Sequence, residues 1–296
     1  MFGADLLTSV DRFGRIPSTG NRDPTRRSAH LCGAMQSLPF SKWQGTGNDF
    51  IVLDDRMGQI PADHRRLAVE LCHRHFGIGS DGLILLQAPR EAGTDYHMEF
   101  LNPDGSRSFC GNGSRCAFAF RSRLMQGRSP ARFTAIDGVH QATWAEEEVE
   151  VTMRDCAGLE TLGPDVELLQ TGSPHLVIWH ADPLSVDLIA AAREWRYGPR
   201  FNAEGVNVNY VRWQHGAVEM RTYERGVEAE TLSCGTGVTA AALSAMARGL
   251  GNGGCTVRTA GGVLRVLAEQ EGSGFVNVRL RGPVEEVYTG NIALRP

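Results

Sequence analysis

Cys110-Gly111-Asn112-Gly113 and Cys234-Gly235-Thr236-Gly237 are two copies of one pattern, Cys-Gly-x-Gly, and each copy opens a predicted helix. The residues that follow are small or apolar around most of each helix, which indicates burial inside a sheet. About one domain length separates the two copies. The pattern therefore predicts a duplicated β-rich domain in which each copy surrounds a central helix. Chance similarity of two glycine-rich turns is the alternative.

The sequence outside these helices favours β-structure. From Phe40 onward, short runs rich in Val, Ile, Leu and Phe are bounded by Gly, Asp and Asn, as strands are. The clearest runs are residues 50–53, 83–86, 149–153, 206–211, 218–223 and 275–280. We predict an α+β fold of two pseudo-symmetric domains, residues 39–155 and 156–285, with a ligand cleft between them. Residues 286–296 are expected to return to the first domain.

Length and charge limit the function classes. The 296 residues suffice for two domains, and a net charge of -4 without a basic stripe argues against nucleic acid as a partner. No apolar stretch approaches the roughly 18 to 20 residues that cross a bilayer, and no secretory pattern opens the chain. These features predict a cytoplasmic protein without a membrane partner. Seven scattered cysteines predict free thiols.

Residues 1–38 differ from the rest of the chain. They mix Arg, Asp, Ser, Thr, Gly and Pro without helical or strand periodicity, so we predict a disordered N-terminal extension. Met35 stands just before the first patterned segment, and translation starting there is one interpretation of everything upstream. A targeting segment is the weaker alternative.

The paired cysteine turns suggest acid/base chemistry. A thiol at a helix N-terminus faces unpaired N–H groups and the positive end of the helix dipole, which can lower its pKa from near 8.5 to about 3.5–7.5. The same N–H groups can bind a substrate carboxylate. Two thiols on opposite faces of one carbon can invert it, because one removes a proton as thiolate while the other delivers a proton. A single Cys before Gly would be ordinary packing.

Two other motifs carry weaker signals. Gly77–Gly82 matches Gly-x-Gly-x-x-Gly, but it follows a helical segment and leads into a strand, which is the reverse of the dinucleotide-binding order. Cys72-His73-Arg74-His75 groups metal-capable side chains, but no second pair stands at zinc-site spacing. A helix end is the better interpretation of the second motif. We therefore predict neither a metal nor a cofactor.

From Phe40 to its C-terminus, the sequence resembles the diaminopimelate epimerase family. The motifs that carry the resemblance are residues 40–50, 77–82, 102–113, 206–207, 224–226 and 234–237. The resemblance implies interconversion of LL- and meso-2,6-diaminopimelate without pyridoxal phosphate or metal, in lysine and peptidoglycan-precursor biosynthesis. It also implies two pseudo-symmetric domains, each with one catalytic cysteine at a central helix. A homodimer is compatible with these features.

Position by position, the resemblance implies that Cys110 and Cys234 are the two catalytic acid/base residues. It assigns the substrate to Asn48, Gly82, Asn102, Gly111, Asn112, Ser173, Asn207, Glu224, Arg225, Gly235 and Thr236. His175 and Glu224 match residues that tune the pKa of the thiols. Ser173 stands where many members have Asn, and Gly82 where some have Gln. The spacing before each catalytic cysteine differs by one residue from the commonest pattern.

Two alternatives remain open on the sequence. A proline or hydroxyproline racemase, or a related isomerase on the same fold, shares the Cys-Gly-Thr-Gly turn. Asn207 and Arg225 argue against this rival, because a small cyclic substrate has no distal amino-acid group to hold. A non-catalytic thiol-containing ligand-binding protein is the alternative from another class. Two acidic, ligand-protected thiols in a titration would favour the enzyme.

Overall fold

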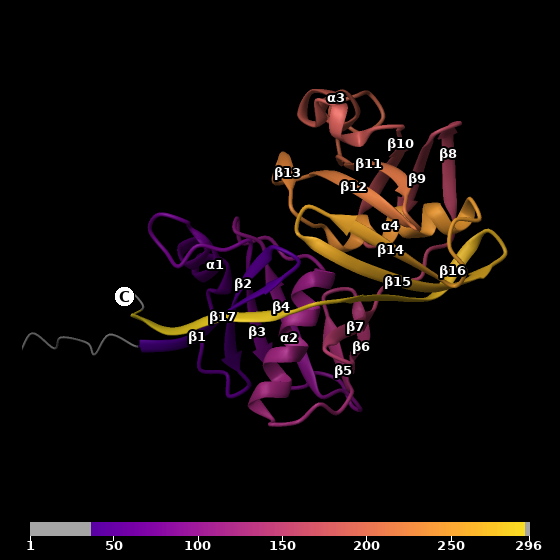
Figure 1. Cartoon of the computed structure of the whole chain (residues 1–296). Helices are drawn as coiled ribbons and strands as arrows, with labels where there is room; N and C mark the ends of the chain where they lie inside the picture. The colour runs from indigo at the N-terminus through magenta and orange to yellow at the C-terminus, as the bar shows by residue number, and fades with distance from the viewer. Residues whose placement is uncertain (1–36, 294–296) are drawn as a thin grey trace, which may run out of the picture.

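The computed structural model describes residues 37–293. Most of the predicted extension, residues 1–36, lies outside the described residues. Ser37 and Leu38, which we expected in that extension, belong instead to the first strand, where Leu38 is buried. The described chain forms two lobes that follow each other in sequence (Figure 1).

The N-terminal lobe is built from seven strands and two helices among the described residues. In chain order they are β1 (Ser37–Gly45), β2 (Asn48–Asp55), α1 (His64–Cys72), β3 (Gly82–Gln87), β4 (Tyr96–Leu101), α2 (Gly111–Leu124), β5 (Ala131–Ala135), β6 (Gly138–Ala145) and β7 (Glu148–Thr152). The Gly77–Gly82 motif therefore joins helix α1 to strand β3, in the order that we predicted.

The C-terminal lobe repeats this succession. Its elements are β8 (Leu159–Gly163), β9 (Val166–Gln170), β10 (Pro174–Trp179), the 3₁₀ helix η1 (Pro183–Ser185), α3 (Leu188–Arg196), β11 (Asn207–Gln214), β12 (Ala217–Glu224), β13 (Ala229–Thr231), α4 (Gly235–Ala247), β14 (Gly254–Thr259), β15 (Gly262–Glu271) and β16 (Gly274–Gly282). The last strand, β17 (Glu285–Ala293), leaves this lobe and pairs antiparallel with β1.

Strand pairing shows the duplication directly. In the first lobe β2 is parallel to β3, β3 antiparallel to β4, β4 parallel to β5, and β5 antiparallel to β6. The second lobe repeats these four relations with β10, β11, β12, β14 and β15. Strand β7 pairs with β16 and joins the two lobes into one continuous sheet. The predicted α+β fold of two pseudo-symmetric halves is confirmed.

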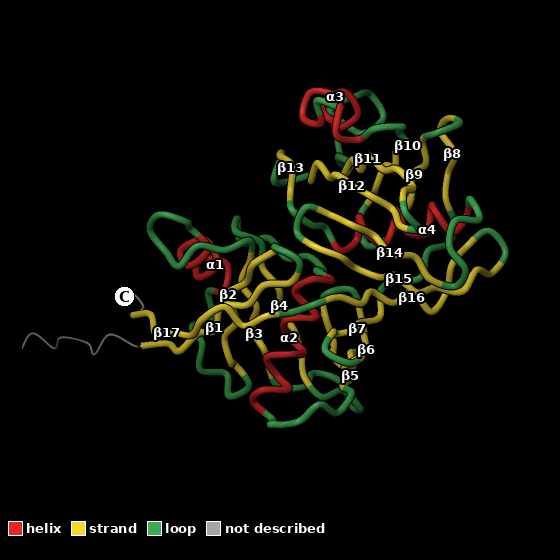
Figure 2. Tube along the Cα trace, viewed as in Figure 1, coloured by secondary structure: helices red, strands yellow, loops and turns green. Residues whose placement is uncertain are grey.

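Helices α2 and α4 occupy equivalent places in this duplication, each packed against the strands of its own lobe (Figure 2). Every residue of α4 from Gly235 to Met246 is buried, and so is α2 from Gly111 to Phe120. The apolar composition of both helices is explained by this burial. In the described part of the chain, no helix has both the length and the apolarity that a membrane span requires.

Candidate active site at two facing helix N-termini

The two Cys-Gly-x-Gly turns meet where the lobes join. Cys110 and Cys234 are the N-cap residues of α2 and α4, and both have extended backbone angles, with φ/ψ of -135°/108° and -122°/113°. Leu280 packs on both following glycines, because an added Cβ would lie 3.0 Å from its Cδ2 at Gly111 and 3.2 Å at Gly235. A side chain at either position would therefore crowd Leu280 where the two helix ends approach each other.

Asn112 forms the direct contact between the two helix ends. An added Cβ at Gly235 would lie 3.1 Å from Asn112 Oδ1, and Asn112 Nδ2 donates a hydrogen bond to the carbonyl oxygen of Ser233 at 3.4 Å. Ser233 directly precedes Cys234. The turn that carries one thiol is thus tied to the segment that carries the other.

Cys110 is half-buried and capped by its own helix. Its Sγ accepts a hydrogen bond from the Gly113 N–H at 3.3 Å and lies 3.9 Å from Asn48 Oδ1. Asn48 Nδ2 donates to Asp81 Oδ2 at 2.8 Å, which turns the Asn48 oxygen toward the thiol. Asp81 therefore fixes the orientation of a predicted substrate-binding amide.

Cys234 is 8% exposed and depends on side chains instead. Its Sγ lies 3.4 Å from Thr236 Oγ1, which in turn lies 2.9 Å from His175 Nε2. Asn209 Nδ2 faces His175 Nδ1 at 3.2 Å, and an amide N–H can only donate, so Nδ1 accepts and Nε2 carries the proton. The Nε2 proton can go to Thr236 Oγ1 or to Ser173 Oγ, which both lie 2.9 Å from it, and the Thr236 hydroxyl can donate to the sulfur.

Burial keeps His175 neutral in this network. Its imidazole is fully buried, and burial together with the charge of Arg225 lowers its pKa to about 3. His175 therefore acts on Cys234 through the Thr236 hydroxyl and not by charge. Of the two residues expected to tune the thiols, His175 is connected to Cys234 through one intervening hydroxyl.

Both thiols are disfavoured as thiolates in this structure. Burial raises the pKa of Cys110 to about 12, against the opposing Gly113 N–H. Burial likewise raises the pKa of Cys234 far above its usual value; the Glu224 carboxylate adds to this rise, and the Thr236 hydroxyl opposes it. The expectation that helix N-termini lower both pKa values is wrong here, because loss of hydration outweighs the helix N–H groups.

Glu224 is the charged group that acts on both thiols. It ends β12, and its Oε2 accepts a hydrogen bond from the Thr231 hydroxyl at 3.0 Å. Burial raises the pKa of Glu224 to about 7, so its charge changes near neutral pH. When ionised, it raises the pKa of Cys110 and of Cys234.

Arg225, Asn207 and Ser173 form one cluster beside this network. Asn207 Nδ2 donates to Ser173 Oγ at 3.1 Å, and Asn207 Oδ1 accepts from the Arg225 backbone N–H at 2.9 Å. The Arg225 guanidinium donates to the carbonyl oxygen of Glu204 at 2.6 Å. Among residues 37–293 no carboxylate forms an ion pair with Arg225, so its charge is available to an anionic ligand.

Two predicted site residues lie outside these clusters. Gly82 opens β3, and an added Cβ there would lie 2.3 Å from the Phe100 ring, so its open side faces the core. Asn102 Nδ2 donates to Ser106 and Ser108 in its own turn. Neither has a hydrogen bond to the thiols or to their partners in the described residues.

The sequence analysis missed Asp81 and Asn209. Asn209 stands two residues after Asn207, so both side chains point to one face of strand β11, and this spacing was an available signal. Asp81 lies inside the glycine motif that we discounted for dinucleotide binding. The motif is defined by its glycines, so it gave no indication that the Asp81 carboxylate would bind Asn48.

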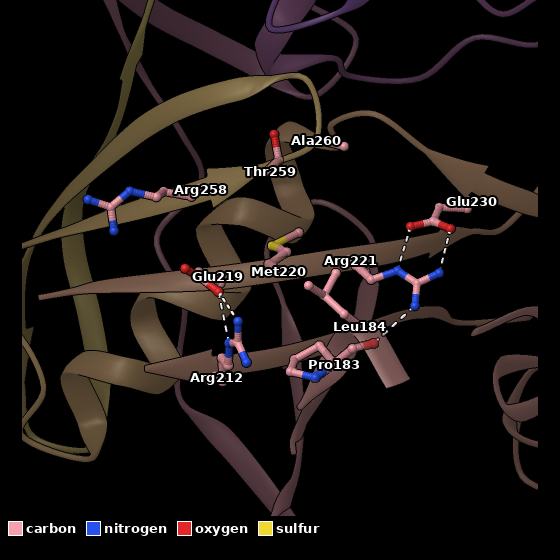
Figure 3. A pocket seen from close by; sticks show the side chains of 10 residues that line it. All are labelled: Pro183, Leu184, Arg212, Glu219, Met220, Arg221, Glu230, Arg258, Thr259 and Ala260. Carbon is pink, nitrogen blue, oxygen red and sulfur yellow. Dashed lines mark hydrogen bonds and ion pairs between the residues drawn. The ribbon is translucent and has the colours of Figure 1, made fainter. Parts of the chain in front are cut away.

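A surface groove on the C-terminal lobe is separate from the thiol site. Figure 3 shows a groove on the C-terminal lobe, whose arginines Arg212 and Arg221 are paired with Glu219 and Glu230 at 2.7 and 2.8 Å. Neither cysteine lines it. Within residues 37–293 no group of three or more His, Cys, Asp or Glu side chains is arranged to hold a metal.

Solved structures share this fold. A hydroxyproline epimerase from Agrobacterium vitis, with bound trans-4-hydroxy-L-proline, superposes with a TM-score of 0.65 at 17% identity, covering 87% of this chain and 93% of that chain. A PhzF-family phenazine biosynthesis protein from Bacillus anthracis gives 0.65 at 13% identity, covering 88% of this chain and 100% of that chain. The molecule is thus of the two-lobed fold that these proteins share.

Sequence comparison gives the family. A family model described as diaminopimelate epimerase matches residues 40–157 and 168–286. The diaminopimelate epimerase of Flavobacterium psychrophilum is 41% identical over 86% of this chain and 100% of its own length. That of Methanocella arvoryzae is 37% identical over 87% and 98%. The chain belongs to the diaminopimelate epimerase family, and the resemblance inferred from the motifs is confirmed.

Proposed function

We propose that this protein converts LL-2,6-diaminopimelate to meso-2,6-diaminopimelate, with Cys110 and Cys234 as the two acid/base residues. Its family relatives carry the name of this activity. The observation that carries the mechanism is the contact between the N-termini of α2 and α4, each capped by a cysteine. The reaction would belong to lysine and peptidoglycan-precursor biosynthesis.

The reaction needs one thiolate and one thiol. The thiolate takes the α-proton and becomes a thiol, while the electron pair left on carbon takes a proton from the other thiol on the opposite face, which becomes the thiolate. Charge is conserved, and the enzyme ends with its two protonation states exchanged. The N–H groups of Gly111, Asn112, Gly235 and Thr236 would stabilise negative charge on the reacting carboxylate.

The high pKa of both buried thiols suits this scheme once substrate is bound. A carbon acid needs a strong base, and a thiolate of raised pKa is a stronger base than an ordinary one. Each sulfur already has one hydrogen-bond donor in place, the Gly113 N–H at Cys110 and the Thr236 hydroxyl at Cys234. These donors limit the cost of forming the thiolate.

Arg225 supports a substrate with a second amino-acid end. Its guanidinium lacks a carboxylate partner among residues 37–293 and can bind a carboxylate through two parallel N–H bonds. Asn207, held by Ser173 and by the Arg225 backbone, would hold the same end of the substrate. Proline and hydroxyproline have no such group, so we favour diaminopimelate over the substrate of the racemase alternative.

The test is incubation of the purified protein with LL-diaminopimelate in deuterated water. We expect the meso isomer to form with one deuterium at the inverted α-carbon. L-Proline and trans-4-hydroxy-L-proline serve as comparison substrates. Turnover of either in place of diaminopimelate would support the racemase alternative, and absence of exchange with all three would support the non-catalytic one.

A further inference from the structure

Arg115 is a buried cation that forms no ion pair with a carboxylate among residues 37–293. It lies one turn into α2 with 0% exposure and is among the largest fully buried side chains of the molecule. Its Nη1 donates to Asn112 Oδ1 at 3.0 Å, its Nη2 donates to Thr46 Oγ1 at 3.4 Å, and its Nε has no partner in the described structure. Burying an unpaired charge is costly, so a role for the charge should be sought.

The surrounding backbone leaves room for this guanidinium. An added Cβ at Gly45 would lie 3.2 Å from Arg115 Nη2, and one at Gly282 would lie 3.5 Å from its Cζ. Gly45 ends β1, and Gly282 ends β16 just before the chain returns to the first lobe. Arg115 therefore sits where the two lobes are joined.

Both acceptors of Arg115 also bind Ser233. Asn112 Nδ2 donates to the Ser233 carbonyl oxygen at 3.4 Å, and the Thr46 hydroxyl donates to Ser233 Oγ at 3.1 Å. Ser233 directly precedes Cys234. By binding Asn112 Oδ1, Arg115 also directs the Asn112 amide nitrogen toward this contact. The guanidinium thus connects the first cysteine turn with the segment that carries the second.

Three ionisable groups, Cys116, Cys110 and Glu148, interact electrostatically with Arg115. Cys110 is the one among them that lies at the N-terminus of α2. Cys116 lies next to it on α2 but outside the helix N-terminus, and Glu148 is already paired with Arg281 at 2.7 Å. Asn112, which accepts from Arg115, also donates to Asn48 Oδ1 at 3.4 Å, and that oxygen lies 3.9 Å from Cys110 Sγ. Attraction to Arg115 opposes the rise in the Cys110 pKa, whereas the charge of Glu224 adds to it. Burial lowers the pKa of Arg115 to about 10, so it stays charged at neutral pH.

We propose that Arg115 is a positioning residue for the two-thiol reaction: its guanidinium orients Asn112 against Ser233 and supplies the positive charge that a thiolate at Cys110 faces. The inference rests on the proposed function, in which Cys110 must become a thiolate in every catalytic cycle. A purely structural arginine would hold the turns together without changing the ionisation of the thiol.

The test compares Arg115→Gln with Arg115→Lys in the full-length protein. Glutamine can still donate to Asn112 but is neutral, whereas lysine keeps the charge. The readout is the rate of iodoacetamide alkylation at Cys110 in the free enzyme near pH 8, where Arg115 is charged, followed by peptide mass spectrometry. Arg121→Gln is the control, because Arg121 lies on the same helix but pairs with Asp95 at 3.1 Å.

Near pH 8, where Arg115 is charged, we expect Cys110 to be alkylated about tenfold more slowly in Arg115→Gln, since a neighbouring opposite charge shifts a pKa by about one unit or more and the thiolate fraction changes in proportion. Arg115→Lys and Arg121→Gln should stay near the wild-type rate. Activity of Arg115→Gln should fall mainly in kcat, with the acidic limb of its pH profile moved to higher pH.

An unchanged rate of Cys110 alkylation in folded Arg115→Gln would overturn the inference, as would equal changes of rate in the glutamine and lysine variants. If Arg115→Gln does not fold, Arg115→Met provides the second neutral variant for the same comparison. Alkylation needs no substrate, so this result is separate from the deuterium experiment, in which an inactive wild type would overturn the proposed function itself.

Discussion

The two halves of the molecule hold equivalent cysteines at equivalent helix N-termini but surround them differently. Cys110 caps its helix through the Gly113 N–H and lies near charged groups, Asp81 through Asn48 and the buried Arg115. Cys234 makes no such cap in its own helix. Its partner is Thr236, aligned by neutral His175.

Duplication has therefore conserved the backbone arrangement but not the polar groups around the two thiols. The repeated strand order and the two N-caps place the thiols symmetrically, as inversion of a carbon requires. The α-carbon that reacts carries four different groups, so the two sides from which the thiols approach are not equivalent, and neither are the two supports. Loss of the Arg115 charge should therefore act on Cys110, and loss of the Thr236 hydroxyl on Cys234, whereas Glu224 should act on both.

The largest effect is expected where the two halves are equivalent. Cys110→Ser and Cys234→Ser should each reduce epimerisation by on the order of 10³-fold, because a hydroxyl is far too weak an acid to supply the base near neutral pH. Product formation with chiral separation of the isomers measures both. Cys116→Ser, a buried thiol on α2 away from the N-cap, is the control. Near-normal turnover in either catalytic variant would refute the two-base scheme.

The next largest loss of activity is expected for a residue of the C-terminal lobe, Arg225. Arg225→Ala should lower kcat/KM for LL-diaminopimelate by at least about thirtyfold, corresponding to about 2 kcal/mol, because the distal carboxylate loses its cationic partner. Arg225→Lys should recover only part, since lysine lacks the planar fork. Steady-state kinetics decide the matter. Little change in Arg225→Ala would show that the distal carboxylate binds elsewhere.

A smaller effect is expected for a change that alters the pKa of both thiols. Glu224→Gln removes a negative charge that raises the pKa of both thiols, so both pKa values should fall. The base form is then present at lower pH, and the acidic limb of the kcat/KM profile should move to lower pH by about half to one pH unit. This is opposite in sign to the shift expected for Arg115→Gln. A limb that moves to higher pH would show that Glu224 acts by another route.

The sequence predicted the parts of the site that depend on local pattern. The two cysteine turns and their buried helices followed from short motifs and composition, and Arg225 and Asn207 from family resemblance. Helix α3 was not predicted, although Leu188, Ala192 and Trp195 recur at helical spacing and Asp187 caps its N-terminus. Local pattern thus sufficed for the repeat and for the thiols.

The features of the site that were not predicted from the sequence depend on long-range packing. Asn209 reaches His175 because β10 and β11 pair in parallel with His175 opposite Asn207, a register that no local motif encodes. The predicted lowering of both thiol pKa values also failed. Helix N–H groups can be inferred from the turn, whereas loss of hydration depends on everything packed around it.

The smallest effect should separate the two thiols most clearly. Thr236→Val keeps the shape of the side chain but removes the hydroxyl that lies 3.4 Å from Cys234 Sγ and 2.9 Å from His175 Nε2. Loss of one such donor costs about 1 kcal/mol, so activity should fall by roughly fivefold to tenfold. Thr236→Ser keeps the hydroxyl and is the matched control. Near pH 8, the rate of alkylation at Cys234 should fall in the valine variant alone, while that at Cys110, whose donor is the Gly113 N–H, stays unchanged. Equal changes of both rates would show that the two thiols ionise as one unit and that their supports are not independent.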